Sequence, residues 1–118
     1  MTDTKTRTRT ITLSNRPPVK IKEAEWPMIA KAEWTDNPAI PVQANRTASV
    51  RVRQHADGRA IVYGTYSTQW QGESDLKSGL LLAKGADIAA AIYGVVDDIG
   101  VTATMAAECV ADLPAEEI

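Results

Sequence analysis

The sequence predicts an α+β fold: a three- to four-stranded antiparallel sheet with two C-terminal helices packed on one face. Three observations carry this prediction. Residues 48–55 alternate apolar and polar side chains with period 2, as a half-buried strand does. An Asp-Gly dipeptide at 57–58 then precedes a return strand over 59–68. Near the C-terminus, 87–99 and 102–113 repeat apolar residues at helical spacing.

Length and composition place the chain among ordinary single-domain proteins. Its 118 residues fit one domain, and 44% apolar residues are enough to bury a core without disulfide bonds. The single cysteine, Cys109, cannot form an intrachain disulfide and fits a reducing compartment. The sequence shows neither an apolar signal region nor a stretch near the roughly 18 apolar residues that span a bilayer. We therefore expect a cytoplasmic protein without a membrane partner.

The N-terminal region is expected to begin with disordered residues and to continue with extended ones. Residues 1–9 alternate Thr with Lys or Arg and offer little apolar surface, so they are expected to form a disordered basic arm. Residues 10–118 would then form the single α+β domain. Within it, 10–13 is expected to extend into a short edge strand, and Arg-Pro-Pro at 16–18 favours a polyproline-type segment.

The next segments are expected to alternate between regular elements and loops. Residues 23–26 are expected to form a helical turn before Pro27, and 28–34 a strand. Prolines and Asp-Asn mark a long irregular loop over 36–41. Three glycines and scattered charges predict that 67–85 is mostly loop.

The turn at 57–58 sets the expected strand register. A two-residue type I′ turn would place Val52 opposite Tyr63 and Arg53 opposite Val62, and opposed residues share a face. The core face would then carry Val50, Val52, Ile61 and Tyr63. The other face would carry Ser49, Arg51, Arg53, His55, Val62 and Tyr66.

Charge is sorted along the chain. Residues 1–22 carry six basic side chains and one acidic, whereas everything after Lys84 carries seven acidic side chains and no basic one. Gly100 and Pro114 are expected to end the two helices, whose acidic residues fall opposite the apolar stripes. We therefore expect an outward-facing acidic docking surface composed of Asp87, Asp97, Asp98, Glu108 and Asp112. The alternative is an ordinary solvated helix face.

The residues offer little for catalysis. A metal site needs three or four ligands, and the chain has one histidine, His55, and one cysteine, Cys109. His55 sits beside a turn and Cys109 on an apolar helix face, which favours structural roles over a nucleophile-base pair. No dinucleotide-binding or P-loop pattern occurs. We predict no enzyme activity, cofactor or metal.

A second candidate surface combines basic and aromatic side chains. Arg51, Arg53, Tyr66 and Trp70 are expected on or beside one sheet face, where they could pair phosphates and stack bases. The plainer interpretation is that the two arginines are solvated strand residues. The third interpretation is a protein interface, with a partner or with a second copy in a homodimer, because Arg, Tyr and Trp are enriched as interface anchors.

Two stretches resemble small accessory proteins of bacterial phages and plasmids. They are VRVRQHADGRAIVYG at 50–64 and DLPAEE at 112–117. The resemblance lies in size and charge, similar to anti-CRISPR proteins, and brings no catalytic residue. It implies an anti-defence role, because small acidic inhibitors of this kind commonly bind a host protein without catalysis.

The function predicted from these features is non-catalytic protein binding. The partner would be a host protein or complex that handles nucleic acid, inhibited by a protein from a mobile element. The alternative is a nucleic-acid-binding accessory protein that uses the basic N-terminal arm and the Arg51/Arg53 sheet face.

Overall fold

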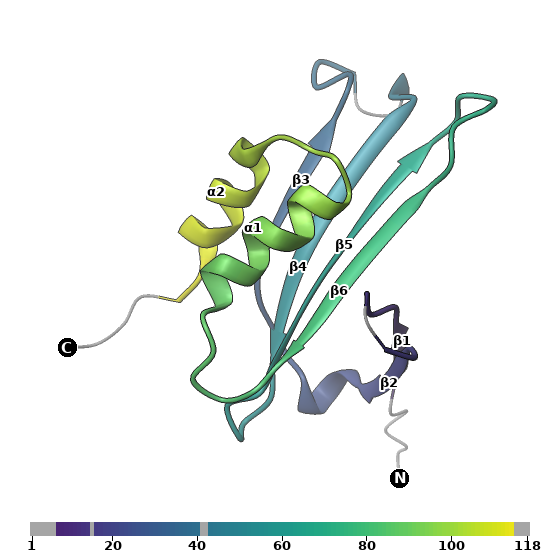
Figure 1. Ribbon diagram of the computed structural model, residues 1–118. Helices are drawn as coiled ribbons and strands as arrows, with labels where there is room; N and C mark the ends of the chain where they lie inside the picture. Colours follow the sequence, from purple (N-terminus) through teal and green to yellow (C-terminus); the bar gives the residue numbers. More distant parts are fainter. Residues whose placement is uncertain (1–6, 15, 41–42, 115–118) are drawn as a thin grey trace, which may run out of the picture.

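The computed structural model describes residues 7–14, 16–40 and 43–114. Its elements, in chain order, are β1 (Thr8–Ile11), β2 (Val19–Lys22), η1 (Glu23–Glu25), β3 (Met28–Thr35), β4 (Arg46–Gln54), β5 (Ala60–Thr68), β6 (Leu76–Leu82), α1 (Ile88–Asp98) and α2 (Ala103–Asp112). A four-stranded antiparallel sheet has the order β3-β4-β5-β6, and β1 and β2 form a separate antiparallel hairpin. The α+β prediction is confirmed, including the two C-terminal helices on the sheet (Figure 1).

The sheet is covered on both faces by different parts of the chain. Helices α1 and α2 lie across one face (Figure 1) and bury a core with β3, β4 and β5. This helix core contains Val50, Val52, Val62, Ile92, Val95, Val96, Ile99, Met105, Ala106 and Cys109, among others. The β1–β2 hairpin covers part of the opposite face and buries a smaller core of Ile11, Leu13, Ile21, Trp26, Ile61 and Tyr63. Each large aliphatic side chain so buried stabilises the fold by about 1.5–3 kcal/mol.

The β4–β5 turn differs from the expected one by a single residue. The His55 N–H donates to the Arg59 carbonyl at 2.9 Å, and the Gly58 N–H donates to the His55 carbonyl at 2.9 Å. These bonds close a three-residue loop over 56–58 in which Gly58 has a φ of +99°. Three-residue loops of this type combine a turn with a residue in the left-handed backbone conformation, which here is Gly58. The predicted two-residue turn was therefore wrong.

The extra loop residue reverses the expected faces of β5. Val52 pairs with Val62, and Arg53 with Ile61. Because side chains alternate with period 2, a one-residue shift moves every β5 side chain to the other face. Val62 therefore lies in the helix core, whereas Tyr63 lies on the face that Arg53 shares.

The structure also contains strands where the sequence predicted none. β6 forms within the 67–85 segment that was expected to be mostly loop, because its partner β5 supplies the hydrogen-bonding ladder. β2 begins directly after the polyproline-type segment expected at 16–18, in residues to which the sequence assigned no element, and it pairs with β1. The sequence placed Thr8 and Arg9 in the disordered arm, but they are the first two residues of β1 and pair with β2. Residues 1–6 of that arm lie outside the described residues.

The remaining elements agree closely with expectation. The turn at Glu23–Glu25, strand β3 and strand β4 are confirmed with end shifts of a residue or two. The side chain of Asp87 caps α1 by accepting from the Ala90 N–H at 3.0 Å, and Gly100, with a φ of +74°, follows its end. In the part of the chain that the structure describes, no helix combines the length and the apolar character needed to cross a bilayer.

Candidate functional site on the uncovered sheet face

The N-terminal hairpin covers only part of the sheet face that lies opposite the helices. Across all four strands runs one row of directly paired residues, Glu33–Ser49–Thr65–Lys77. These four side chains are polar and at least partly exposed. The same face is apolar only where the hairpin packs on Ile61 and its neighbours. Polar side chains thus predominate where the face is uncovered, and Arg53 is a charged side chain that lies under the covered part.

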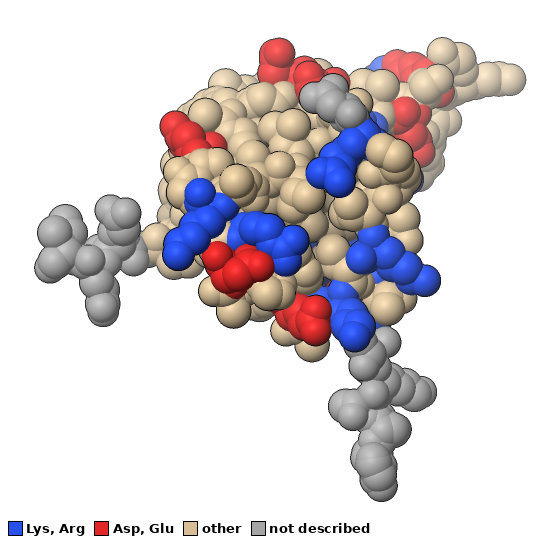
Figure 2. Space-filling model, turned by 60° about the horizontal axis from the view of Figure 1, so that its bottom comes forward, with Lys and Arg blue, Asp and Glu red and all other residues tan. Residues whose placement is uncertain are grey.

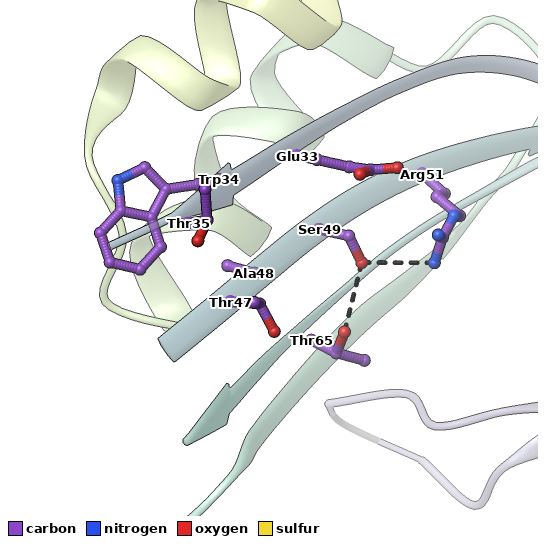
Figure 3. A pocket seen from close by; sticks show the side chains of 8 residues that line it. All are labelled: Glu33, Trp34, Thr35, Thr47, Ala48, Ser49, Arg51 and Thr65. Atoms are coloured by element: carbon purple, nitrogen blue, oxygen red, sulfur yellow. Dashed lines mark hydrogen bonds between the residues drawn. The ribbon is translucent and has the colours of Figure 1, made fainter. Parts of the chain in front are cut away.

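The uncovered part forms a shallow groove, which we call the Arg51 groove. Its main hollow measures about 380 Å³. The residues that line it are Glu33, Trp34, Thr35, Thr47, Ala48, Ser49, Arg51 and Thr65 (Figure 3). A smaller hollow of about 180 Å³ shares Arg51 and Thr65 with it and extends to Arg9 on β1 and Lys77 on β6. The groove therefore crosses the sheet from edge to edge beside the hairpin.

Arg51 is the most centrally placed cation in the groove. Its Nη1 lies 3.3 Å from the Ser49 Oγ, which in turn lies 3.3 Å from the Thr65 Oγ1 (Figure 3). Among the described residues, neither Arg51 nor its neighbours Lys31 and Lys77 forms an ion pair with a carboxylate. Their charges are thus available to an anionic ligand.

Arg53 does not belong to this exposed set. Only 7% of it is exposed, and the hairpin covers it. Its Nε donates to the Tyr63 hydroxyl at 2.9 Å, its Nη1 donates to the Trp26 carbonyl at 3.0 Å, and its Nη2 lies 3.6 Å from the Glu23 carboxylate. The expectation that Arg53 is displayed beside Arg51 was wrong, because the N-terminal hairpin folds over it.

Tyr66 and Trp70 are separated from Arg51 as well. Tyr66 pairs with Ala48 and packs at the margin of the helix core, so the β5 register places it on the opposite sheet face. Trp70 is 50% exposed in the β5–β6 loop, where the Arg46 guanidinium lies 5.5 Å from its ring centroid. The predicted face of Arg51, Arg53 and Tyr66 therefore does not exist as one surface.

The five helix carboxylates are all exposed, as expected. Three of them also make internal contacts. Asp87 caps α1, Asp98 accepts from the Ser78 hydroxyl at 2.8 Å, and Asp112 accepts from the Lys31 N–H at 3.0 Å. In the described part of the chain, the side chains of Asp97 and Glu108 have no such contact.

The acidic and basic segments of the sequence also lie on different sides of the folded molecule. The two helices carry acidic residues without a Lys or Arg, and they lie on one face of the sheet. The N-terminal hairpin on the other face carries Arg7, Arg9, Arg16, Lys20 and Lys22 against Glu23 and Glu25. Figure 2 shows Lys and Arg side chains spread over the lower end of the molecule, with some acidic side chains among them. The molecule therefore presents surfaces of opposite sign.

Cys109 and His55 occupy structural environments. Cys109 is fully buried in the helix core, and its burial, with a smaller effect of Asp112, raises the thiol pKa to about 11. The His55 ring packs edge-on against Trp26 with 5.0 Å between centroids. Across the described residues, no group of three His, Cys, Asp or Glu side chains could hold a metal ion.

Most residues of the Arg51 groove were not predicted from the sequence. Lys31, Glu33 and Thr35 alternate with alanines and Trp34 in β3, and this alternation was the available signal. Lys77 was missed because β6 was taken for a loop. The chain matches no model of a protein family, no curated protein and no solved structure.

Proposed function

We propose that the protein is a non-catalytic protein-binding module of the cytoplasm, and that it binds a basic partner through the outer surface of its two helices. One observation carries the proposal. The helical layer displays five exposed carboxylates and not one Lys or Arg. Such a single-sign surface steers a partner of opposite charge and raises the rate of association.

The class of partner follows from charge and from the resemblance to small accessory proteins of phages and plasmids. A host complex that handles nucleic acid offers a basic surface, to which an acidic protein can bind in place of phosphates. Inhibition of such a complex by a mobile-element protein of the anti-CRISPR kind is the activity that we propose.

The test reverses the charges that support no internal contact. Asp97→Lys and Glu108→Lys are suitable, whereas Asp98 and Asp112 also hold other elements in place. Glu25→Lys is the matched control, because it changes the same charge at an exposed position of η1, away from the helices. All three variants should unfold within about 0.5 kcal/mol of the wild type.

Each protein is immobilised and used to capture partners from a nuclease-treated bacterial lysate. Wild type and Glu25→Lys should retain the same protein, and the helix variants should lose it. With the purified partner, the on-rate should fall as salt rises, since charges are screened beyond about 8 Å at physiological ionic strength. Equal capture by the helix variants, or capture that disappears with nuclease, would contradict the proposal, and the second result would favour nucleic-acid binding.

A further inference from the structure

We infer that the Arg51 groove is a second binding site, which takes an acidic peptide segment of a protein partner. It lies on the sheet face opposite the helices, so it is distinct from the acidic surface of the proposed function. Three properties of the groove support this inference: its charges, its hydrogen-bonding groups and its scarcity of exposed aromatic rings, of which Trp34 provides one.

The charge of the groove favours an anion. Arg51, Lys31 and Lys77 line or border it, and Glu33 is the carboxylate that accompanies them. No ion pair within the described chain neutralises any of the three cations. Arg51 is partly buried and anchored on Ser49, so its guanidinium loses little conformational freedom on binding a carboxylate.

The hydrogen-bonding groups in the groove fit a polypeptide. The hydroxyl groups of Thr35, Thr47, Ser49 and Thr65 both donate and accept hydrogen bonds, and the exposed Glu33 carboxylate accepts them. An acidic peptide alternates backbone N–H donors with carbonyl and carboxylate acceptors. It therefore matches a groove that offers cations, hydroxyls and one carboxylate.

The same groups suit a nucleic acid less well. A single strand binds through aromatic side chains on which successive bases stack. Tyr63 on this face is 8% exposed, and its hydroxyl is engaged by Arg53. Trp34 lines the groove, but its partly buried ring also packs against the helix core, so it offers one stacking position and not a row of them. The balance of groups thus favours peptide over nucleic acid.

The width of the sheet sets the length of the segment. The groove crosses four strands, and neighbouring strands lie about 4.8 Å apart, so its floor spans roughly 14 Å. An extended chain rises about 3.4 Å per residue. A segment of about four residues therefore fills the groove, and two carboxylates spaced along it would reach Arg51 and Lys77.

The test titrates the full chain, labelled with ¹⁵N, with acetylated hexaglutamate amide. Hexaglutamine and hexathymidylate serve as probes that lack, respectively, the charge and the peptide backbone. Hexaglutamate should shift the amide signals of groove residues in β3, β4, β5 and β6. Arg51→Gln and Lys77→Gln should each raise Kd about fivefold, the effect of losing one partly exposed charge pair. Lys84→Gln, which removes an exposed lysine outside the groove, should leave Kd unchanged.

Several results would overturn the inference. One is the absence of saturable amide shifts with hexaglutamate at millimolar concentration. Others are equally tight binding of hexaglutamine and tighter binding of hexathymidylate at the same residues. A Kd for hexaglutamate that rises as much in Lys84→Gln as in the groove variants would also overturn it. Unchanged affinity of both Arg51→Gln and Lys77→Gln for hexaglutamate would likewise overturn the inference. Asp97→Lys and Glu108→Lys should bind hexaglutamate at least as well as the wild type, so the two proposals fail independently.

Discussion

The Arg53 guanidinium donates through Nε to the Tyr63 hydroxyl at 2.9 Å, and both side chains are more than nine-tenths buried. The bond joins β4 to β5 beneath the N-terminal hairpin. Burying a guanidinium is costly unless its donors are satisfied, and here Trp26 and Glu23 provide the further partners. This cluster therefore ties the hairpin to the sheet.

Tyr63→Phe should lower the free energy of unfolding by about 1–3 kcal/mol, because it leaves a buried charged donor without its partner. Urea denaturation measures the change. Tyr93→Phe is the control, since Tyr93 is 45% exposed on α1 and should lose almost nothing. Equal stability of the two variants would show that the Arg53 bond contributes no net energy.

Gly58→Ala should destabilise the β4–β5 turn by about 1 kcal/mol or more, because its φ of +99° is strained for a residue with a Cβ atom. The added Cβ would also lie 2.6 Å from the Lys84 Cγ, so that side chain must move. Gly94→Ala in α1 is the opposite case: its Cβ meets open space, and alanine favours a helix by about 0.8–1 kcal/mol over glycine. Thermal unfolding should therefore move in opposite directions for the two variants, and a rise in Tm for Gly58→Ala would refute the turn geometry.

The Glu23 carboxylate should make stability depend on pH. Its hydrogen bond from Arg9 lowers the Glu23 pKa in the folded protein below the ordinary value of 4.5, so the charged form is favoured by folding. The resulting stability is present above the ordinary pKa and is lost as the pH falls through the folded value. Glu23→Gln should therefore be less stable than the wild type at pH 7, and the difference should shrink in acid. Urea midpoints for both proteins between pH 7 and pH 2 measure it, and a constant difference would exclude the Arg9 bond as its source.

Local patterns predicted the helices and the central strands, whereas long-range contacts decided which side chains the sheet face opposite the helices exposes. The helix boundaries follow from spacing, the Asp87 cap and Gly100. The faces of β5 depend on a single extra residue in the turn at Gly58, which Asp-Gly alone does not specify. The burial of Arg53 depends on Trp26 and Glu23, 27 and 30 positions earlier in the chain, and no local pattern announces that contact.

The outer strands of the sheet, β3 and β6, do not leave all of their outward backbone N–H and C=O groups unpaired. On β6, the Gly79 carbonyl accepts from the Ser14 N–H at 2.9 Å, and the Gly79 N–H donates to the Ser14 Oγ at 3.1 Å. A Cβ atom on Gly79 would collide with the Thr12 carbonyl oxygen, so residues 12–14 lie directly against this strand. On β3, Asp112 accepts from the Lys31 N–H. Contacts from within the same chain thus occupy the backbone groups of Gly79 on β6 and the Lys31 N–H on β3. A strand from another molecule would have to displace these contacts before it could extend the sheet, which guards the protein against edge-to-edge aggregation.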